Sequence, residues 1–436
     1  MVESQLSQIA TWFEDLSPDP EWSFAGLTQK ETTYATHSYH RYPAKFIPQL
    51  AARLMQRYSQ EGEMILDPFM GSGTTLVEAK LLRRPSLGVD INPVAHLIAR
   101  AKLQAFSPTE LTQIIRHLKG ELSLSLEYGL FRSNPVRPIS PFPERLRYWF
   151  PDEVLEQLSL ITQAVKQLNP RHQDFFFCAL SHSLKSVSYW HDRSIKPTRK
   201  LHKSIPPPLS VFFRQVARME KGNQTFWEVL QRQKALEVPA TPYLGDARSL
   251  PIENEKVDCI ITSPPYVTSY EYADLHQLSL LWFGWADNLR QARERFIGTA
   301  SPSRRSKDLP LYSPLAESIK NKVAQTDPRK AEEIQSYFQD MGTAFTEMHR
   351  VLRRGGYICI VIGNTSLAKV EIKNAQVFAE QLTSLGFQIE KVILREIPSK
   401  ILPQTRDKIT GRFARTQEAD FLAYPSEAIL IAKKAT

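Results

Sequence analysis

The strongest constraint on the fold of this 436-residue chain is a short apolar run that leads through a glycine-containing turn into a helical pattern. The run covers residues 63–66, the turn begins at Asp67 and contains Gly71 and Gly73, and the helical pattern covers residues 76–82. Glycine reaches positive φ and lets a ligand approach the backbone. Strand, glycine turn and helix together open the α/β units that bind nucleotides. The turn has neither the GxGxxG spacing nor a P-loop lysine, so it favours neither a dinucleotide nor a triphosphate.

Acidic residues accompany the next strand patterns. Asp90 ends an apolar run about 20 residues beyond the glycines, where an acid can bind ribose hydroxyls. Asp246 stands just before another run, residues 257–261, which leads to Ser263. Since ligands of doubly wound sheets bind at the carboxyl ends of strands, we expect these residues and Asp67 along one edge. The pattern predicts a site for a nucleoside-containing cofactor there.

The four residues Ser263-Pro264-Pro265-Tyr266 leave the last of these strand patterns. Two prolines fix φ and remove two backbone donors, so nearby carbonyls can accept hydrogen bonds from an exocyclic amine. Ser263 adds a small hydroxyl, and Tyr266 adds a flat face on which a heterocycle can stack. The competing interpretation is a proline-rich turn capped by a tyrosine. The glycine turn and the acids favour the amine-binding interpretation.

Composition narrows the class of protein and its partners. Lys and Arg total 55 against 46 Asp and Glu, a formal charge of +9 that fits an anionic partner such as nucleic acid. Cys178, Cys259 and Cys359 stand far apart in apolar runs, so we expect buried thiols and neither a zinc site nor a disulfide framework. No signal peptide opens the chain and no apolar run reaches membrane-spanning length. We expect a cytoplasmic protein without membrane attachment.

In these motifs the chain resembles the S-adenosylmethionine-dependent DNA amino-methyltransferases, most closely their N4-cytosine branch. The stretch 67–74 is similar to the family's donor-binding loop, and the segment 37–46 is similar to the part that precedes it and helps to wrap the methionine moiety. The resemblance implies cofactor-binding roles for Lys45, Asp67, Phe69, Gly71, Ser72, Gly73, Thr74, Asp90 and Asp246. It implies catalytic roles for Ser263, Pro264, Pro265 and Tyr266.

The same resemblance implies an α/β fold, a Rossmann-like methyltransferase core with a mixed seven-stranded sheet. Spaced apolar positions in residues 111–126 and 154–168 predict that a mainly helical insertion accompanies this core. Residues 1–104 and 241–436 would form the catalytic domain. About 155 residues separate Asp90 from Asp246, far more than a bare βα unit needs, and residues 105–240 are therefore expected to be a helical insertion that recognises the DNA target.

The function that follows is transfer of a methyl group from S-adenosyl-L-methionine to the exocyclic N4 of a cytosine flipped out of double-stranded DNA. In the family, Ser at the first tetrad position usually accompanies N4-cytosine and Asp accompanies N6-adenine. The chemistry requires neither a metal nor a covalent intermediate. N6-adenine methylation and a catalytically silent nucleic-acid-binding protein remain alternatives. A cognate restriction endonuclease as partner, and the oligomeric state, stay open.

Three basic segments are candidates for contact with DNA. Residues 185–203 interleave cations with Tyr189 and Trp190, a composition that suits phosphate contacts and base wedging. The competing interpretation is a solvated cationic face beside a core tryptophan. Residues 290–307 could cover the site or follow a phosphate strand, and a flexible surface loop is an equal alternative. Residues 400–415 lie between two strand patterns, where a long hairpin is expected.

Overall fold

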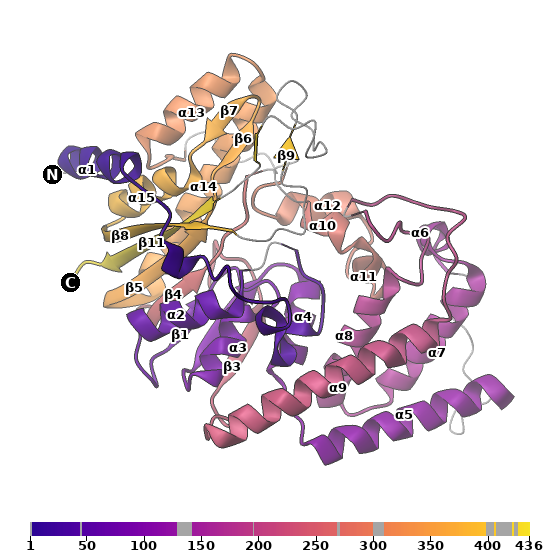
Figure 1. The fold of residues 1–436 in the computed structure, drawn as a ribbon. Coiled ribbons are helices and arrows are strands. Elements are labelled where there is room, and N and C mark those ends of the chain that lie inside the picture. Colours follow the sequence, from indigo (N-terminus) through magenta and orange to yellow (C-terminus); the bar gives the residue numbers. More distant parts are fainter. Residues whose placement is uncertain are drawn as a thin grey trace.

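The computed structural model describes residues 2–43, 46–128, 142–194, 196–267, 271–299, 309–397, 405–406, 421–422 and 426–436. Its centre is a seven-stranded sheet in the order β3-β2-β1-β4-β5-β11-β8 (Figure 1). Neighbours from β3 to β5 run parallel, whereas β11 is antiparallel to both β5 and β8. The expected mixed seven-stranded sheet is confirmed. The strands are β1 (Ile65–Asp67), β2 (Ser86–Asp90), β3 (Ala240–Leu244), β4 (Val257–Thr262), β5 (Leu352–Ile362), β8 (Phe387–Glu396) and β11 (Ser426–Lys434).

Alternating side chains in the central strands serve two different cores. In β4, Cys259 and Ile261 pack with α2 (Pro48–Tyr58), whereas Ile260 packs on the opposite face with α14 (Pro328–Val351) and α15 (Asn374–Ser384). Because successive residues of a strand point to opposite faces, a run that is apolar throughout must be covered on both sides. The predicted burial of the three cysteines is confirmed.

Several helices begin where a side-chain cap precedes a proline. Asn92, Asn169, Ser313 and Asp327 each accept a hydrogen bond from a first-turn N–H, and each is followed by Pro. Such a residue satisfies a donor that the helix leaves free, and proline at the first position is already set in a helical φ. The remaining helices are α1 (Val2–Glu14), α3 (Thr74–Leu81), α4 (Pro93–Leu103), α5 (Pro108–Tyr128), α6 (Glu144–Trp149), α7 (Asp152–Lys166), α8 (Pro170–Leu184), α9 (Pro208–Arg232), α10 (Tyr272–Leu275), α11 (Gln277–Trp282), α12 (Leu289–Arg295) and α13 (Pro314–Ala324).

Helices α5 to α9 gather on one side of the sheet (Figure 1) and form a core of their own with α4, α10 and α11. Helix α9 links this helical core to the sheet. Its first half buries Phe212 in the helical core, and its second half buries Phe226 against α3. Gly222 allows α9 to lie close to the backbone of Ala35, because a Cβ at position 222 would lie 2.6 Å from the Ala35 carbonyl oxygen. The helical core therefore includes residues that follow the tetrad, such as Leu278, as well as the segment 105–240.

Two short antiparallel pairs complete the described strands. One joins β6 (Thr365–Leu367) to β7 (Val370–Ile372), and the other joins β9 (Thr405–Arg406) to β10 (Phe421–Leu422). Most of the basic segment 400–415 lies outside the described residues, as does Lys45. Among the helices that are described, none is long and apolar enough to cross a membrane.

Candidate active site

The carboxyl ends of four parallel strands meet at one cavity. Asp67 ends β1 and Asp90 ends β2, while Asp246 and Ser263 follow the ends of β3 and β4. The register holds these ends level, since Asp90 pairs with Leu244 at the end of β3. The cavity has about 810 Å³ of empty space, which includes the solvent at its open mouth. Its lining comprises Tyr42, Phe46, Asp67, Pro68, Phe69, Met70, Gly71, Ser72, Thr74, Asp90, Ile91, Asp246, Ala247, Ser263, Pro265, Tyr272, Arg295, Phe296 and Ile297.

Asp67 joins the glycine turn to the end of β4. Its carboxylate accepts hydrogen bonds from the Thr75 hydroxyl at 2.6 Å, the Thr262 hydroxyl at 2.7 Å and the Phe69 backbone N–H at 3.1 Å. Burial raises the pKa of Asp67 to about 6, and the three hydrogen bonds oppose that rise by favouring the charged form. The residue therefore fixes the turn relative to the strand that carries the tetrad.

Asp90 fixes the other side of the turn. It accepts the backbone N–H of Gly71 at 2.9 Å and that of Asn92 at 2.8 Å. Burial raises the pKa of Asp90 to about 7, with a smaller contribution from the charge of Asp67. Gly71 has a φ of 47°, and a Cβ there would lie 3.0 Å from the Tyr42 ring, so a larger residue would disturb the wall of the cavity.

Two hydroxyls at and just before the start of α3 have no hydrogen-bond partner among the described residues. Ser72 and Thr74 line the cavity, and their buried hydroxyl oxygens form no hydrogen bond to any described residue. Buried polar groups normally have a partner, so these two fit a polar ligand. Gly73 has a φ of 72° and instead packs against Ala99, since a Cβ would lie 2.9 Å from the Ala99 Cβ. Lys102 donates to the Ser72 carbonyl at 2.7 Å and holds the turn from behind.

Asp246 is positioned by a neighbouring arginine. Its carboxylate accepts the Arg248 backbone N–H at 3.0 Å and two guanidinium hydrogen bonds at 2.8 and 2.6 Å. Arg248 also donates to Asp340 at 3.0 Å, and the guanidinium therefore joins Asp246 to α14. Paired arginine–carboxylate contacts of this kind set orientation as well as charge.

The tetrad presents its first and third residues to the cavity. Ser263 and Pro265 belong to the lining, whereas Pro264 is buried beside it. The Tyr337 hydroxyl donates to the Pro265 carbonyl at 2.9 Å. Within the described part of the chain, no donor reaches the Pro264 carbonyl. The geometry leaves one serine hydroxyl and one proline carbonyl as acceptors at the end of β4.

Tyr266 does not belong to the cavity lining. Its hydroxyl lies at the end of β5, so close that a Cβ on Gly363 would be 3.2 Å away. Burial raises the pKa of Tyr266 well above its usual range, and the ring packs against the core of α14 and α15. The structure therefore brings Ser263 and Pro265 together with the three acids and leaves the Tyr266 ring behind them.

Aromatic residues that the sequence did not single out build the opposite wall. Tyr42 stacks on His276 at 5.0 Å and on Tyr272 at 6.2 Å, and Tyr272 stacks on Phe296 at 6.5 Å. Burial lowers the pKa of His276 to about 3, so the imidazole is neutral in the stack. The similarity of segment 37–46 to a donor-wrapping segment was the available signal for Tyr42 and Phe46.

Part of the second basic segment covers the tetrad. Arg295, Phe296 and Ile297 line the cavity, and Gly298, with a φ of 79°, lies so close that a Cβ would be 2.7 Å from the Tyr266 carbonyl oxygen. Of the three interpretations of residues 290–307, the described part supports a cover for the site. Residues 300–308 lie outside the described residues.

Comparison with known proteins defines the class. The model of the N6/N4 DNA methylase family matches residues 5–101 and 257–435. The chain is 27% identical over 403 residues to the type II methyltransferase M.MvaI of Kocuria varians, covering 87% of this chain and 88% of that protein. It is 42% identical over 106 residues to M.MjaII of Methanocaldococcus jannaschii, covering 24% of this chain and 20% of that protein. A solved SAM-dependent methyltransferase from Methanosarcina mazei matches with 10% identity and a TM-score of 0.30, covering 88% and 97% of the two chains.

A seven-stranded α/β sheet with a cavity at its carboxyl edge is the fold of the S-adenosylmethionine-dependent methyltransferases. The chain belongs to the DNA methylase family. It is accordingly a DNA methyltransferase, and S-adenosyl-L-methionine is its methyl donor. Independently of the family match, the residues that line the cavity suit that donor. They combine acids, hydroxyls without a partner among the described residues, and an aromatic wall.

Proposed function

We propose that this enzyme methylates the exocyclic N4 of cytosine at a defined sequence in double-stranded DNA. The observation that carries the proposal is that Ser263 and Pro265 open on the same cavity as Asp67, Asp90 and Asp246. A donor site and an amine-accepting tetrad thus share one space. The type II methyltransferases among its relatives support a defined target sequence and a place beside a restriction endonuclease.

The donor would be held by residues from three strand ends. Asp90 would bind the ribose hydroxyls, Asp246 the adenine ring, and the hydroxyls of Ser72 and Thr74 the polar methionine end, since all four residues line the cavity. The aromatic wall of Tyr42 and its neighbours would exclude water from the base. When bound, the donor supplies a methyl group on a sulfonium, an electrophile that needs no further activation.

The tetrad would orient the acceptor. A cytosine amine can donate one hydrogen bond to the Pro264 carbonyl and another to the Ser263 hydroxyl oxygen. Both bonds draw the nitrogen lone pair out of conjugation with the ring, and this makes the amine a nucleophile. Holding the two reactants in line supplies much of the rate through proximity.

The target base must leave the duplex before it can reach the tetrad. Unstacking costs roughly a few kcal/mol, which contacts elsewhere on the DNA must offset. The Tyr266 ring is the proposed stacking partner, and because it packs behind the cavity lining in this structure, stacking would require it to turn toward the cavity. Helices of the segment 105–240 are proposed to hold the opened DNA, because they join the cavity wall through α4 and α11.

Ser263 supports cytosine as the acceptor, since it resembles the first tetrad residue of the N4-cytosine branch. N6-adenine is the second candidate, because a purine amine could donate to the same two acceptors. Incubation of the enzyme with mixed-sequence duplex DNA and labelled donor, followed by nucleoside digestion and mass spectrometry, separates the two. N4-methylcytosine is the expected product. N6-methyladenine would replace the proposed acceptor, and no label in DNA would indicate a silent binding protein.

A further inference from the structure

The basic segment between α8 and α9 is a loop held together by its own hydrogen bonds. Some of its cations make these internal contacts, and others are exposed to solvent. We name residues 185–203 the Trp190 loop. The Trp190 side chain is only 2% exposed and stacks on Trp149 of α6 at 5.3 Å. The sequence interpretation of Trp190 as a base wedge is therefore not supported by this structure, because the ring is part of the helical core. The buried Trp190 ring anchors the loop to the helical core, and this anchor holds the charged residues of the loop in a defined position.

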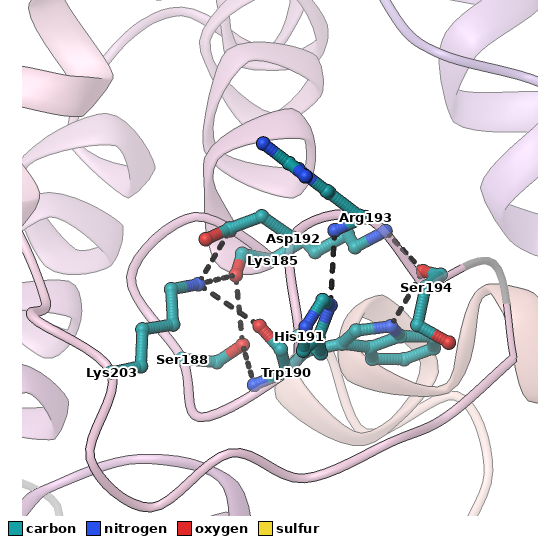
Figure 2. Close-up of polar contacts among 8 residues, drawn as sticks. All are labelled: Lys185, Ser188, Trp190, His191, Asp192, Arg193, Ser194 and Lys203. Atoms are coloured by element: carbon teal, nitrogen blue, oxygen red, sulfur yellow. Dashed lines mark hydrogen bonds and ion pairs between the residues drawn. The ribbon is translucent and has the colours of Figure 1, made fainter.

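Two lysines are used inside the loop. Lys203 donates to the carbonyls of Lys185 at 3.1 Å and Trp190 at 3.0 Å and pairs with Asp192 at 2.7 Å. Lys185 donates to the Ser194 carbonyl at 2.7 Å. Figure 2 shows both ammonium groups within this cluster, whereas the Arg193 guanidinium extends away from it. The internal lysines satisfy backbone carbonyls that a loop would otherwise leave to water.

Other cations of the loop remain outside. Arg193, Lys196 and Lys200 are exposed, and no carboxylate in the described part of the chain pairs with them. Arg199 lies over the rings of Tyr148 at 4.4 Å and Tyr189 at 5.1 Å, and Tyr148 is 51% exposed. A guanidinium stacked in this way keeps its N–H edge available for a phosphate. Four exposed cations within eight residues of the chain, none paired with a carboxylate in the described part, favour a polyanionic partner.

The loop is tied to the segment that lines the cavity. His40 contacts the Ser181 hydroxyl at 3.1 Å, and Ser181 in turn contacts Ser279 of α11 at 2.7 Å. Ser181 lies in the last turn of α8, and the loop begins directly after that helix. The residue two positions beyond His40 is Tyr42, which forms the cavity wall. The helix that precedes the loop therefore contacts the segment that contributes Tyr42 to the cavity wall.

We propose that the Trp190 loop is a phosphate-binding surface for the DNA duplex that flanks the target base, with Arg193, Lys196, Arg199 and Lys200 as its contacts. This inference rests on the proposed function in one respect, the choice of DNA as the nucleic acid. The phosphate-binding role itself is inferred from the exposed cations. Backbone contacts of this type would set the position of the enzyme on the duplex without reading its sequence.

The test measures duplex binding by the full-length enzyme as a function of salt. Lys196→Gln with Lys200→Gln should reduce the slope of log affinity against log salt by about 2, since each phosphate contact contributes about 0.9. At 100 mM salt the affinity should fall about tenfold or more. The doubly conservative Lys196→Arg, Lys200→Arg variant should keep the slope of the wild type. Donor affinity measured by calorimetry should not change in either variant.

A matched control removes the same charge elsewhere. Lys322 of α13 and Lys391 of β8 are both exposed, and these two elements lie away from α6 to α9 in Figure 1, so their double Gln variant should keep the wild-type slope. Equal slopes for the loop variant and the wild type, or an equal loss in the control, would overturn the inference. If the loop variant loses slope but no methyl reaches DNA in the wild type, the proposed function fails and the surface stands. If the wild type methylates cytosine and the slope is unchanged, only the surface fails.

Discussion

The cavity at the edge of the sheet and the Trp190 loop handle charge in opposite ways. In the cavity, Asp67 is buried and Asp90 is partly buried, and burial raises the pKa of both carboxyls. In the loop, Arg193 and Lys200 are exposed, and only the internal Lys185 and Lys203 are tied to backbone carbonyls. A small ligand such as the methyl donor can be enclosed in a cavity, whereas a polymer such as DNA can bind only to an exposed surface. The comparison indicates that donor binding and DNA binding can be perturbed separately.

The largest effect is expected from Ser263→Ala. Loss of the hydroxyl removes one of the two acceptors for the target amine, and kcat should fall about 100-fold, as when one polar group is removed from a transition-state site. Donor affinity should stay within about twofold of the wild type, because the hydroxyls of Ser72 and Thr74 and the acids remain. Single-turnover methylation and calorimetry measure the two quantities. Ser366→Ala, on an exposed β6 residue, is the control, and wild-type kcat in Ser263→Ala would remove the serine from the mechanism.

A tenfold or greater loss of donor affinity is expected from Asp90→Ala, about 1.4 kcal/mol or more of binding free energy. The carboxylate accepts the backbone N–H groups of Gly71 and Asn92, so its loss both removes a ribose partner and loosens the glycine turn. Isothermal calorimetry measures the change. Asp287→Ala, at an exposed position, should bind the donor normally. Unchanged affinity in Asp90→Ala would reject its assigned role.

The pH dependence of stability should reveal the buried acid. The pKa of Asp90 is raised from 3.8 to about 7 in the folded enzyme, so the folded state holds a proton that the unfolded chain has released. Stability from this group is complete below about pH 4 and is lost as pH rises through about 7. The melting temperature of Asp90→Asn minus that of the wild type should therefore increase from pH 4.5 to pH 7.5, by about 2 °C or more. A flat difference, like that expected for Asp287→Asn, would contradict the burial.

The smallest effect is expected from Lys203→Met. The ammonium contacts two carbonyls and Asp192, and its loss should loosen the Trp190 loop with a decrease of about 1 kcal/mol in the free energy of unfolding. Hydrogen exchange of residues 188–194 should accelerate, while donor binding remains unchanged. Lys391→Met serves as the exposed control. Normal protection of the loop in Lys203→Met would show that the internal lysine does not hold it.

The arrangement of the sheet edge could be predicted because it follows from topology. Asp67, Asp90 and Ser263 stand at or next to the ends of apolar runs, and parallel strands bring such ends together whatever the side chains around them. The mixed sheet is implied by the resemblance to the methyltransferase family, whereas the helical character of most of residues 105–240 follows from apolar periodicity.

Side-chain direction could not be predicted, because it depends on neighbours that are distant in sequence. The sequence does not reveal that the Tyr266 hydroxyl lies beside Gly363, nearly a hundred residues later, or that Trp190 stacks on Trp149. Nor does it separate the lysines that bind carbonyls inside the Trp190 loop from those that face solvent. Composition identified the basic segment, and packing determined which of its cations remain available.

The most direct test of the central claim is methylation-aware sequencing of DNA from a host that expresses this chain. The account predicts N4-methylcytosine at one recurrent sequence, and its absence when the host expresses the Ser263→Ala variant at the same level. The experiment reports the acceptor atom and the target site together. N6-methyladenine at a recurrent sequence, or the same N4-methylcytosine pattern in the Ser263→Ala host, would contradict the account.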